Sequence, residues 1–205
     1  MKTMKIASLA IVSMAVSMMD ASSAQSAKPS QAEIVMKASF LERGQAKLDR
    51  LEQDETQRLC SQYPEKRPAN IAKKIEALNL KLIKYPSDGK MLGDWKEGEK
   101  IAQSGVGKQF SDNPANANGG NCYACHQLTK AEISFGNIGP SLYNFGKLRG
   151  FNEATQKYTF GKIYNANAYS ACSNMPRFGH NGILTEQQVK HVTALLMDPE
   201  SPVNK

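Results

Sequence analysis

Apolar residues recur at helical spacing in four segments of this 205-residue chain, and no pair of segments alternates as strands do. The first segment covers residues 31–63, where Gly44 weakens the pattern in the middle. The second covers residues 70–82. A third helix is expected to begin at Asp94 and a fourth at Thr185, each with an acidic or amide residue three positions on, as in a capping box. The pattern predicts an all-α protein.

Turn-forming residues divide the chain into regions. Two prolines separate the first two predicted helices, and the run Y-P-S-D-G at residues 85–89 predicts a turn at a domain boundary. We therefore expect a helical extension over residues 25–88 and a second domain over residues 89–205. Residues 136–182 are rich in Gly, Asn and Tyr and are expected to form loops. So long a loop-rich stretch needs something other than its own secondary structure to pack around.

The first residues have the pattern of an export signal. Two lysines open the chain, and residues 6–19 form an apolar run of 14 residues, short for a bilayer span of about 20. Small residues follow, with Ala24 and Ala27 as alternative cleavage points. We expect residues 1–24 to be a removed signal peptide and the mature protein to lie in the periplasm, where disulfides form.

The chain has a formal charge of +7. No dense run of Lys and Arg with interleaved aromatic residues is present, and together with export this argues against nucleic acid as a partner. The basic surface is either a solvated face or a means of docking to an acidic partner protein.

Two of the four cysteines lie in the motif C-Y-A-C-H, which covers residues 122–126. This spacing is typical of covalent haem c attachment: Cys122 and Cys125 reach two vinyl groups on one porphyrin edge, and His126 projects at the iron. A zinc site would need two further ligands in paired spacing, and a thioredoxin-like pair would follow a strand. The sequence offers neither, so it predicts one haem c.

The haem iron needs a sixth ligand or keeps an open position. The downstream candidates are Met175, His180, His191 and Met197. Met175 is favoured because the following proline stiffens its loop, and His/Met ligation suits an electron carrier. His180, in the same loop, is the main competitor, while His191 is expected on the surface of a helix and Met197 in the core.

From Gly93 to the C-terminus the chain resembles class I cytochromes c, and within them SoxX, the monohaem subunit of the SoxAX cytochromes of thiosulfate oxidation. Five segments carry the resemblance: G-N-C-Y-A-C-H (120–126), G-N-I-G-P-S-L (136–142), M-P-R-F-G (175–179), G-I-L-T (182–185) and D-P-E-S-P-V-N (198–204). Arg177 stands where the family more often has proline. The two prolines of the last segment indicate a stiff, extended tail that can lie against a partner.

The resemblance implies a class I cytochrome c fold with an N-terminal helical extension and an electron-transfer role. It implies His126 and Met175 as axial ligands, and it favours the Pro140 carbonyl as acceptor for the Nδ1 hydrogen of His126, against a plain turn there. It implies a heterodimer with SoxA, which holds the substrate site of L-cysteine S-thiosulfotransferase. The carrier SoxYZ and a soluble cytochrome c acceptor would be transient partners. It assigns no catalytic residue to this chain.

Two other functions stay open, a free-standing periplasmic electron shuttle and a ligand-binding or peroxidase-like haem protein. The remaining cysteines, Cys60 and Cys172, are also open. In an oxidising compartment they are expected to form a disulfide between the extension and the loop of Met175, closing a loop of more than 100 residues. The alternative leaves one or both thiols free, with Cys172 near the haem.

Overall fold

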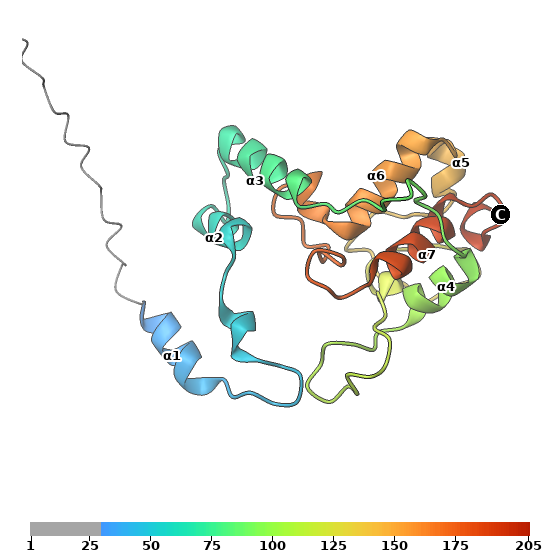
Figure 1. Ribbon diagram of the computed structural model, residues 1–205. Helices are drawn as coiled ribbons and strands as arrows, with labels where there is room; N and C mark the ends of the chain where they lie inside the picture. The colour runs from blue at the N-terminus through green and yellow to red at the C-terminus, as the bar shows by residue number, and fades with distance from the viewer. Residues whose placement is uncertain (1–29) are drawn as a thin grey trace, which may run out of the picture. The chain divides into compact units, whose positions relative to one another are not determined.

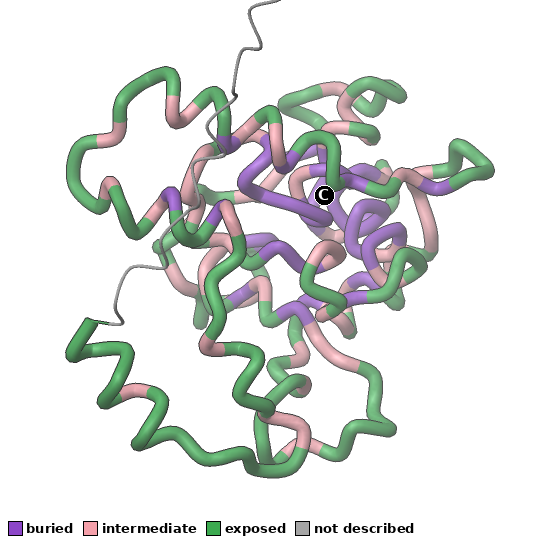
Figure 2. Tube along the Cα trace, turned by 60° about the vertical axis from the view of Figure 1, so that its left-hand side comes forward, coloured by how far each residue is buried: buried purple, intermediate pink, exposed green. Residues whose placement is uncertain are grey.

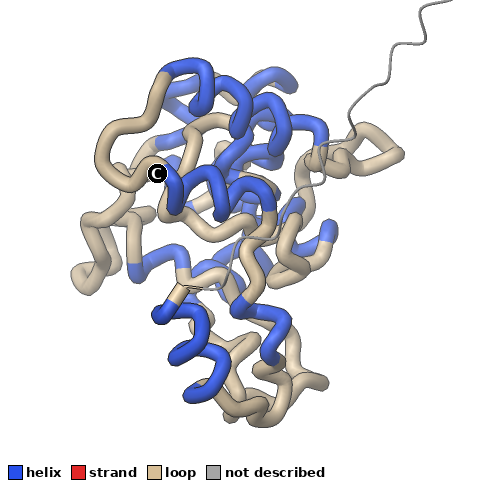
Figure 3. The backbone as a smooth tube through the Cα atoms, turned by 90° about the vertical axis from the view of Figure 1, so that its left-hand side faces the viewer, coloured by secondary structure: helices blue, strands red, loops and turns tan. Residues whose placement is uncertain are grey.

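The computed structural model describes residues 30–205, and these residues form helices and loops without a β-strand (Figure 3). The all-α prediction is therefore confirmed. The chain divides into two units, residues 1–39 and residues 40–205. The described part of the first unit is mainly α1 (Gln31–Ser39), a helix in which no side chain is buried. The predicted signal peptide lies outside the described residues, and so does its cleavage point.

The second unit contains the helices drawn from cyan to red in Figure 1. Its α-helices are α2 (Glu55–Gln62), α3 (Ala69–Lys81), α4 (Trp95–Gln103), α5 (Phe145–Arg149), α6 (Glu153–Tyr164) and α7 (Glu186–Met197). Short 3-10 helices lie before, between and after them: η1 (Leu48–Leu51), η2 (Cys122–Ala124), η3 (Ala166–Ala168) and η4 (Pro202–Asn204). The boundary expected near residue 88 stays a prediction, since residues 40–205 form one unit.

The core of the second unit is built around α7. Thr185 begins this helix with the predicted capping box, in which the side chain of Gln188 accepts from the Thr185 N–H at 3.0 Å. Buried apolar side chains from α7, α6 and the loops form one cluster, drawn purple in Figure 2. Each fully buried side chain of this kind contributes about 1.5–3 kcal/mol. Helix α7 therefore anchors the domain.

Helices α4 and α7 cross at Gly98. A β-carbon there would lie 2.2 Å from the His191 carbonyl oxygen, so only glycine permits this approach. His191 is not a free surface residue: its Nδ1 accepts from the Asp94 N–H at 2.8 Å. The Asp94 side chain caps α4 by accepting from Lys96 N, while Glu97 pairs with Lys100. Asp94 therefore does begin α4, but the capping box predicted there is wrong.

The first predicted helix, residues 31–63, is broken in the structure. Gly44 has a left-handed backbone (φ +52°) in a tight turn that brings Arg43 and Ala46 together. A new helix, α2, then starts at the capping box of Asp54 and Gln57. Local turn chemistry thus outweighs the loose apolar spacing. The second predicted helix, residues 70–82, is confirmed as α3 within one residue at each end.

Residues 136–182 are less irregular than expected, because they include α5 and α6. Helix α6 has no apolar stripe: it buries Thr159, Phe160 and Gly161 in succession, on several of its faces. A helix enclosed in this way lacks the one-sided pattern that predicts a surface helix. This is why periodicity missed it.

The C-terminal tail is also not extended. Asn204 is buried, and its side-chain nitrogen donates to the carbonyl oxygens of Leu196 (3.1 Å) and Asp198 (2.9 Å). Its Oδ1 accepts from the Gly146 N–H at 2.9 Å. The tail therefore folds back as η4 and ties α7 to α5. Over the described residues, none of the helices has the length and apolar character needed to cross a bilayer.

Candidate haem site

The C-Y-A-C-H motif forms a single tight turn. Asn121 enters it with a left-handed backbone (φ +46°), and η2 follows. The N–H groups of Cys125 and His126 both donate to the Cys122 carbonyl oxygen, at 3.1 and 2.9 Å. Tyr123 is buried and its hydroxyl donates to Glu99 on α4 at 3.0 Å. The turn is thus fixed to α4 and brings the two cysteines and the histidine together.

Cys122 and Cys125 are free thiols that do not pair with each other. Burial raises the pKa of the Cys122 thiol to about 12, so it is neutral at physiological pH. Among residues 30–205 no three His, Cys, Asp or Glu side chains gather as a metal cluster would require. Both sulfur atoms of the motif are unbonded and can react with a group attached at this turn.

The loop of residues 136–142 runs along this turn. The N–H groups of Gly136 and Gly139 donate to the carbonyl oxygens of Tyr123 and Cys125, each at 2.8 Å. The Nδ1 atom of His126 lies 2.7 Å from the Pro140 carbonyl oxygen. Because a carbonyl only accepts, Nδ1 carries the proton and Nε2 keeps a lone pair. The predicted hydrogen bond is present.

Gly139 sets the position of the imidazole. A β-carbon on this residue would lie 2.1 Å from Cε1 of His126, so the ring packs directly on the glycine backbone. The sequence analysis gave Gly139 no contact of its own, because its only local signal is its place before Pro140 in the segment G-N-I-G-P-S-L.

Met175 lies in the loop between η3 and α7. It is partly buried and packs against the same apolar cluster as Cys122. Its N–H donates to the Ser173 hydroxyl at 3.2 Å. The other three candidates are placed differently: Met197 is buried in α7, His191 bonds to Asp94, and Nε2 of His180 lies 4.0 Å from the Asp54 carboxylate.

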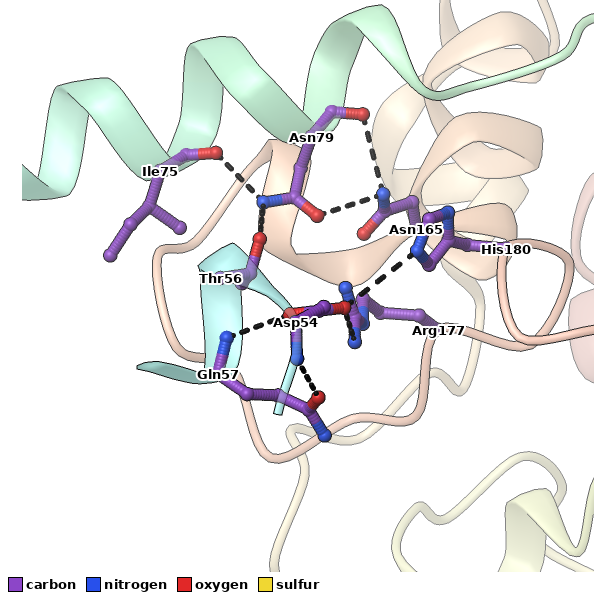
Figure 4. A network of polar contacts seen from close by, with 8 residues as sticks. All are labelled: Asp54, Thr56, Gln57, Ile75, Asn79, Asn165, Arg177 and His180. Carbon is purple, nitrogen blue, oxygen red and sulfur yellow. Dashed lines mark hydrogen bonds and ion pairs between the residues drawn. The ribbon is translucent and has the colours of Figure 1, made fainter. Parts of the chain in front are cut away.

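The His180 ring is partly buried in a charged setting. Burial lowers its pKa, the nearby Arg177 guanidinium lowers it further, and the Asp54 carboxylate opposes both. The ring therefore belongs to a polar group that joins the extension to the loop after Met175 (Figure 4).

Large apolar side chains lie exposed on the segment between His126 and Pro140. Ile133 is 91% exposed, Ile138 76% and Phe135 42%. Three large exposed apolar side chains within six residues indicate a surface that a ligand or a partner can cover. They follow Cys125 by 8 to 13 positions.

Cys60 and Cys172 form a disulfide, with their Cα atoms 5.7 Å apart. The expected pairing is therefore present, and it joins α2 to the residue three positions before Met175. The salt bridge between Asp54 and Arg177 was not expected, because nothing in the sequence relates two residues 123 positions apart.

Comparison with known proteins gives two results. Residues 106–198 match the cytochrome c family. An "Uncharacterized lipoprotein" of Aquifex aeolicus (strain VF5) is 39% identical over 158 residues, which cover 75% of this chain and 73% of the relative. That match is longer than the region after residue 88, so it includes part of the helical extension.

A cytochrome c domain implies covalently attached haem c and, in general, electron transfer. The family match spans the C-Y-A-C-H turn, the Pro140 loop and Met175. The chain is therefore a c-type cytochrome, with its cytochrome c domain at residues 106–198 and a family relationship to the Aquifex lipoprotein.

Proposed function

We propose that Cys122 and Cys125 hold the haem c through thioether bonds and that His126 is its first axial ligand. The observation that carries this is the His126–Pro140 hydrogen bond of 2.7 Å, within a turn that also holds the two free thiols. It fixes the imidazole with its Nε2 lone pair free, as an iron ligand requires.

The surroundings fit the group. A thioether forms when S–H adds across a vinyl C=C bond, with sulfur on one carbon and hydrogen on the other. This addition needs no leaving group. Its product would be a neutral thioether, which is compatible with the apolar surroundings of the thiol. The exposed Ile133, Phe135 and Ile138 would be covered by an apolar macrocycle attached at this turn.

We propose Met175 as the second axial ligand. Its competitors are engaged elsewhere: His180 faces Asp54, both ring nitrogens of His191 have partners, and Met197 lies in the core. Bound haem supplies a one-electron couple between ferric and ferrous iron. A thioether opposite an imidazole favours the ferrous state and raises the reduction potential.

The ligand assignment is tested by Met175→Ala in the haem-loaded protein. We expect loss of the thioether-to-iron absorption band and tight binding of carbon monoxide to the ferrous form. Met91 is a matched control, because it is another partly buried methionine on the same cluster. Met91→Ala should keep the band, and a band that survives Met175→Ala would contradict the assignment.

We propose further that the chain acts as the SoxX-like electron-transfer subunit of a thiosulfate-oxidising complex. It would form a heterodimer with a SoxA-type cytochrome that holds the substrate site, and it would pass electrons from thiosulfate attachment on SoxYZ to a soluble cytochrome. Support comes from the five sequence segments, including the tail of residues 198–204. In this structure that tail packs against α5 and α7, so it supports the fold itself.

The test is co-purification from thiosulfate-grown cells. We expect a larger haem protein to accompany the chain, and thiosulfate-dependent cytochrome reduction to be lost with Met175→Ala and kept with Met91→Ala. A monomer without a haem-protein partner would favour a free-standing electron shuttle. Rapid binding of carbon monoxide by the unaltered ferrous protein would favour a ligand-binding haem protein.

We propose the periplasm as the location, after cleavage at Ala24 or Ala27. The relative is named a lipoprotein, but a lipid on cysteine needs a free thiol. Cys60 and Cys172 form the disulfide, and the two free thiols, Cys122 and Cys125, are assigned to haem. Cell fractionation with the intact mass of the mature chain tests this: a mass increased by a lipid would contradict it.

A further inference from the structure

The loop that carries Met175 is attached to the helical extension on both sides of the methionine. On the N-terminal side the Ala171 N–H donates to Glu76 Oε1 of α3 at 3.2 Å. Cys172 follows, in its disulfide with Cys60 of α2. On the C-terminal side Arg177 donates to the Asp54 carboxylate at the start of α2, at 2.6 Å. The attachments lie four and three residues before Met175 and two residues after it.

The Cys172 attachment holds a demanding backbone conformation. Cys172 has φ +60°, in the left-handed region that residues other than glycine rarely adopt. A residue stays there only when its surroundings fix it, and the disulfide and the two neighbouring polar contacts do so. Those contacts are the Ala171 N–H to Glu76 and the Arg67 guanidinium to the Ala171 carbonyl oxygen.

The Arg177 attachment is shielded from water. The Arg177 side chain is 6% exposed, and its Nη2 bonds to Asp54 Oδ2, while Asp54 Oδ1 accepts from the Gln57 N–H at 2.8 Å. The single carboxylate thus caps α2 and binds the loop at once. Removing its charge would leave a buried guanidinium without its anion, which is a costly arrangement.

Helix α2 is itself fixed, so it can act as a support. Asn79 of α3 donates to the Thr56 hydroxyl of α2 at 2.8 Å, and its Oδ1 accepts from Asn165 at 3.0 Å (Figure 4). Asn165 ends α6, and the three side chains are buried. The network ties α2 and α3 to the cytochrome domain. These buried hydrogen bonds favour one arrangement of the packing, although Asn165 Oδ1 has no partner within the described residues.

We propose that α2 is a brace that positions Met175, with Asp54, Arg177 and the Cys60–Cys172 disulfide as its positioning groups. The proposal rests on the assignment of Met175 as an iron ligand. A loop already held in place loses little conformational entropy when its thioether binds, so the ligand binds more strongly. A freed loop spends more time away from the iron, and an external ligand then competes better.

The test is competition by imidazole in the ferric, haem-loaded protein. Imidazole binds where Met175 leaves, so its apparent Kd reports how firmly the loop is held. Asp54→Asn removes the charge that faces Arg177 but keeps the cap, because asparagine is an equally good N-cap residue. We expect its apparent Kd for imidazole to fall about tenfold, and the reduction potential to fall. The double variant Cys60→Ala/Cys172→Ala should give at least the same effect.

Two controls separate positioning from general stability. Glu55→Gln removes an exposed charge from the next residue of α2, where Glu55 pairs with Arg58 and Lys74. Ile75→Val creates a small cavity in the core of the extension without touching the loop. Both should leave the Kd for imidazole within twofold of the parent, although the second lowers the unfolding midpoint. Arg177→Lys keeps a positive charge that can face Asp54, so it should change the Kd for imidazole less than Asp54→Asn does.

The outcomes distinguish this inference from the proposed function. If Asp54→Asn and the double alanine variant both keep the parent Kd while the parent shows the thioether band, the brace is refuted and the ligand assignment stands. If the parent lacks the band and Met175→Ala matches it, both fail. Should the double alanine variant not fold, Asp54→Asn alone decides.

Discussion

Gly98 of α4 lies directly against the backbone of His191 in α7. A β-carbon on Gly98 would be 2.2 Å from the His191 carbonyl oxygen and 3.0 Å from the Leu195 β-carbon. The turn that contains Cys122 is attached to α4 at this crossing, because the Tyr123 hydroxyl donates to Glu99 of α4. This close helix contact therefore also positions the proposed haem attachment.

This contact predicts that Gly98→Ala destabilises the protein. The new methyl group meets backbone atoms, which cannot rotate away, so the helices must separate. We expect a loss of about 2–3 kcal/mol in the free energy of unfolding, measured by urea denaturation of the haem-loaded protein. Lys96→Ala, on the exposed side of the same helix, should change it by less than about 0.5 kcal/mol.

The packing of His126 on Gly139 predicts a second effect. In Gly139→Ala the β-carbon would overlap the imidazole, 2.1 Å from Cε1, and push the ring from the Pro140 carbonyl. Loss of the hydrogen bond that orients a metal-ligating histidine typically costs about 10–100-fold in metal affinity or activity. We expect an altered ferrous spectrum and a His126 Nδ1–H that exchanges with solvent faster in NMR. An unchanged exchange rate would show that the hydrogen bond does not depend on this glycine.

Thiol counting tests both cysteine pairs at once. In the haem-loaded protein, unfolded without reductant, we expect alkylation to modify no cysteine, because two are thioethers and two form the disulfide. After reduction, Cys60 and Cys172 alone should react. Mass mapping locates any exception: unreduced labelling at Cys60 and Cys172 would contradict the disulfide, and labelling at Cys122 or Cys125 would contradict covalent attachment.

The features that the sequence predicted are those encoded within a few residues. Helix α7 has its capping box and apolar stripe in one stretch, and the C-Y-A-C-H turn has its chemistry in five consecutive residues. The Asp54–Gln57 capping box was equally local and could have placed the start of α2. It was hidden because a loose apolar spacing across residues 31–63 suggested one longer helix.

The features that the sequence did not predict depend on distant partners. Asp54 meets Arg177 across 123 positions, and Asn79 meets Asn165 across 86. Neither pair leaves a periodic signal in the sequence, because the two residues of each pair meet only after the chain has folded. The disulfide was foreseeable from the compartment, yet only the fold shows that it holds the loop of Met175.

The buried amide network predicts a large effect of Asn79→Ala. This change removes the donor to the buried Thr56 hydroxyl and the side-chain acceptor of Asn165, whose nitrogen keeps only its longer bond to the backbone carbonyl of residue 79 at 3.3 Å. A buried polar group that loses its partner costs about 1–3 kcal/mol. We expect the free energy of unfolding to fall by about 2–4 kcal/mol. Asn70→Ala, at the exposed start of α3, serves as the control and should be nearly neutral. A near-neutral Asn79→Ala would mean that water replaces the lost amide.

Two groups in the brace predict how stability depends on pH. Burial lowers the pKa of His180, and Arg177 and Lys84 lower it further against the pull of Asp54. Burial alone would raise the pKa of Asp54, but the Gln57 N–H and the Arg177 guanidinium outweigh it and the pKa is lowered. Both groups therefore bind protons less readily in the folded protein than in the unfolded chain.

It follows that acid destabilises the fold in two steps. As pH falls below the ordinary histidine pKa of 6.5, the unfolded chain takes up a proton that folded His180 resists, and stability declines until the lowered pKa is passed. Asp54 adds a second decline below its ordinary pKa of 3.8. One group contributes at most about 1.4 kcal/mol per pH unit. Urea unfolding at stepped pH should show the first decline in the parent and a smaller one in His180→Asn. The parent and His180→Asn differ in this one ring, so the difference in how their free energies of unfolding change with pH reports on it. Equal changes in the two proteins between pH 7 and 5 would contradict the role of His180.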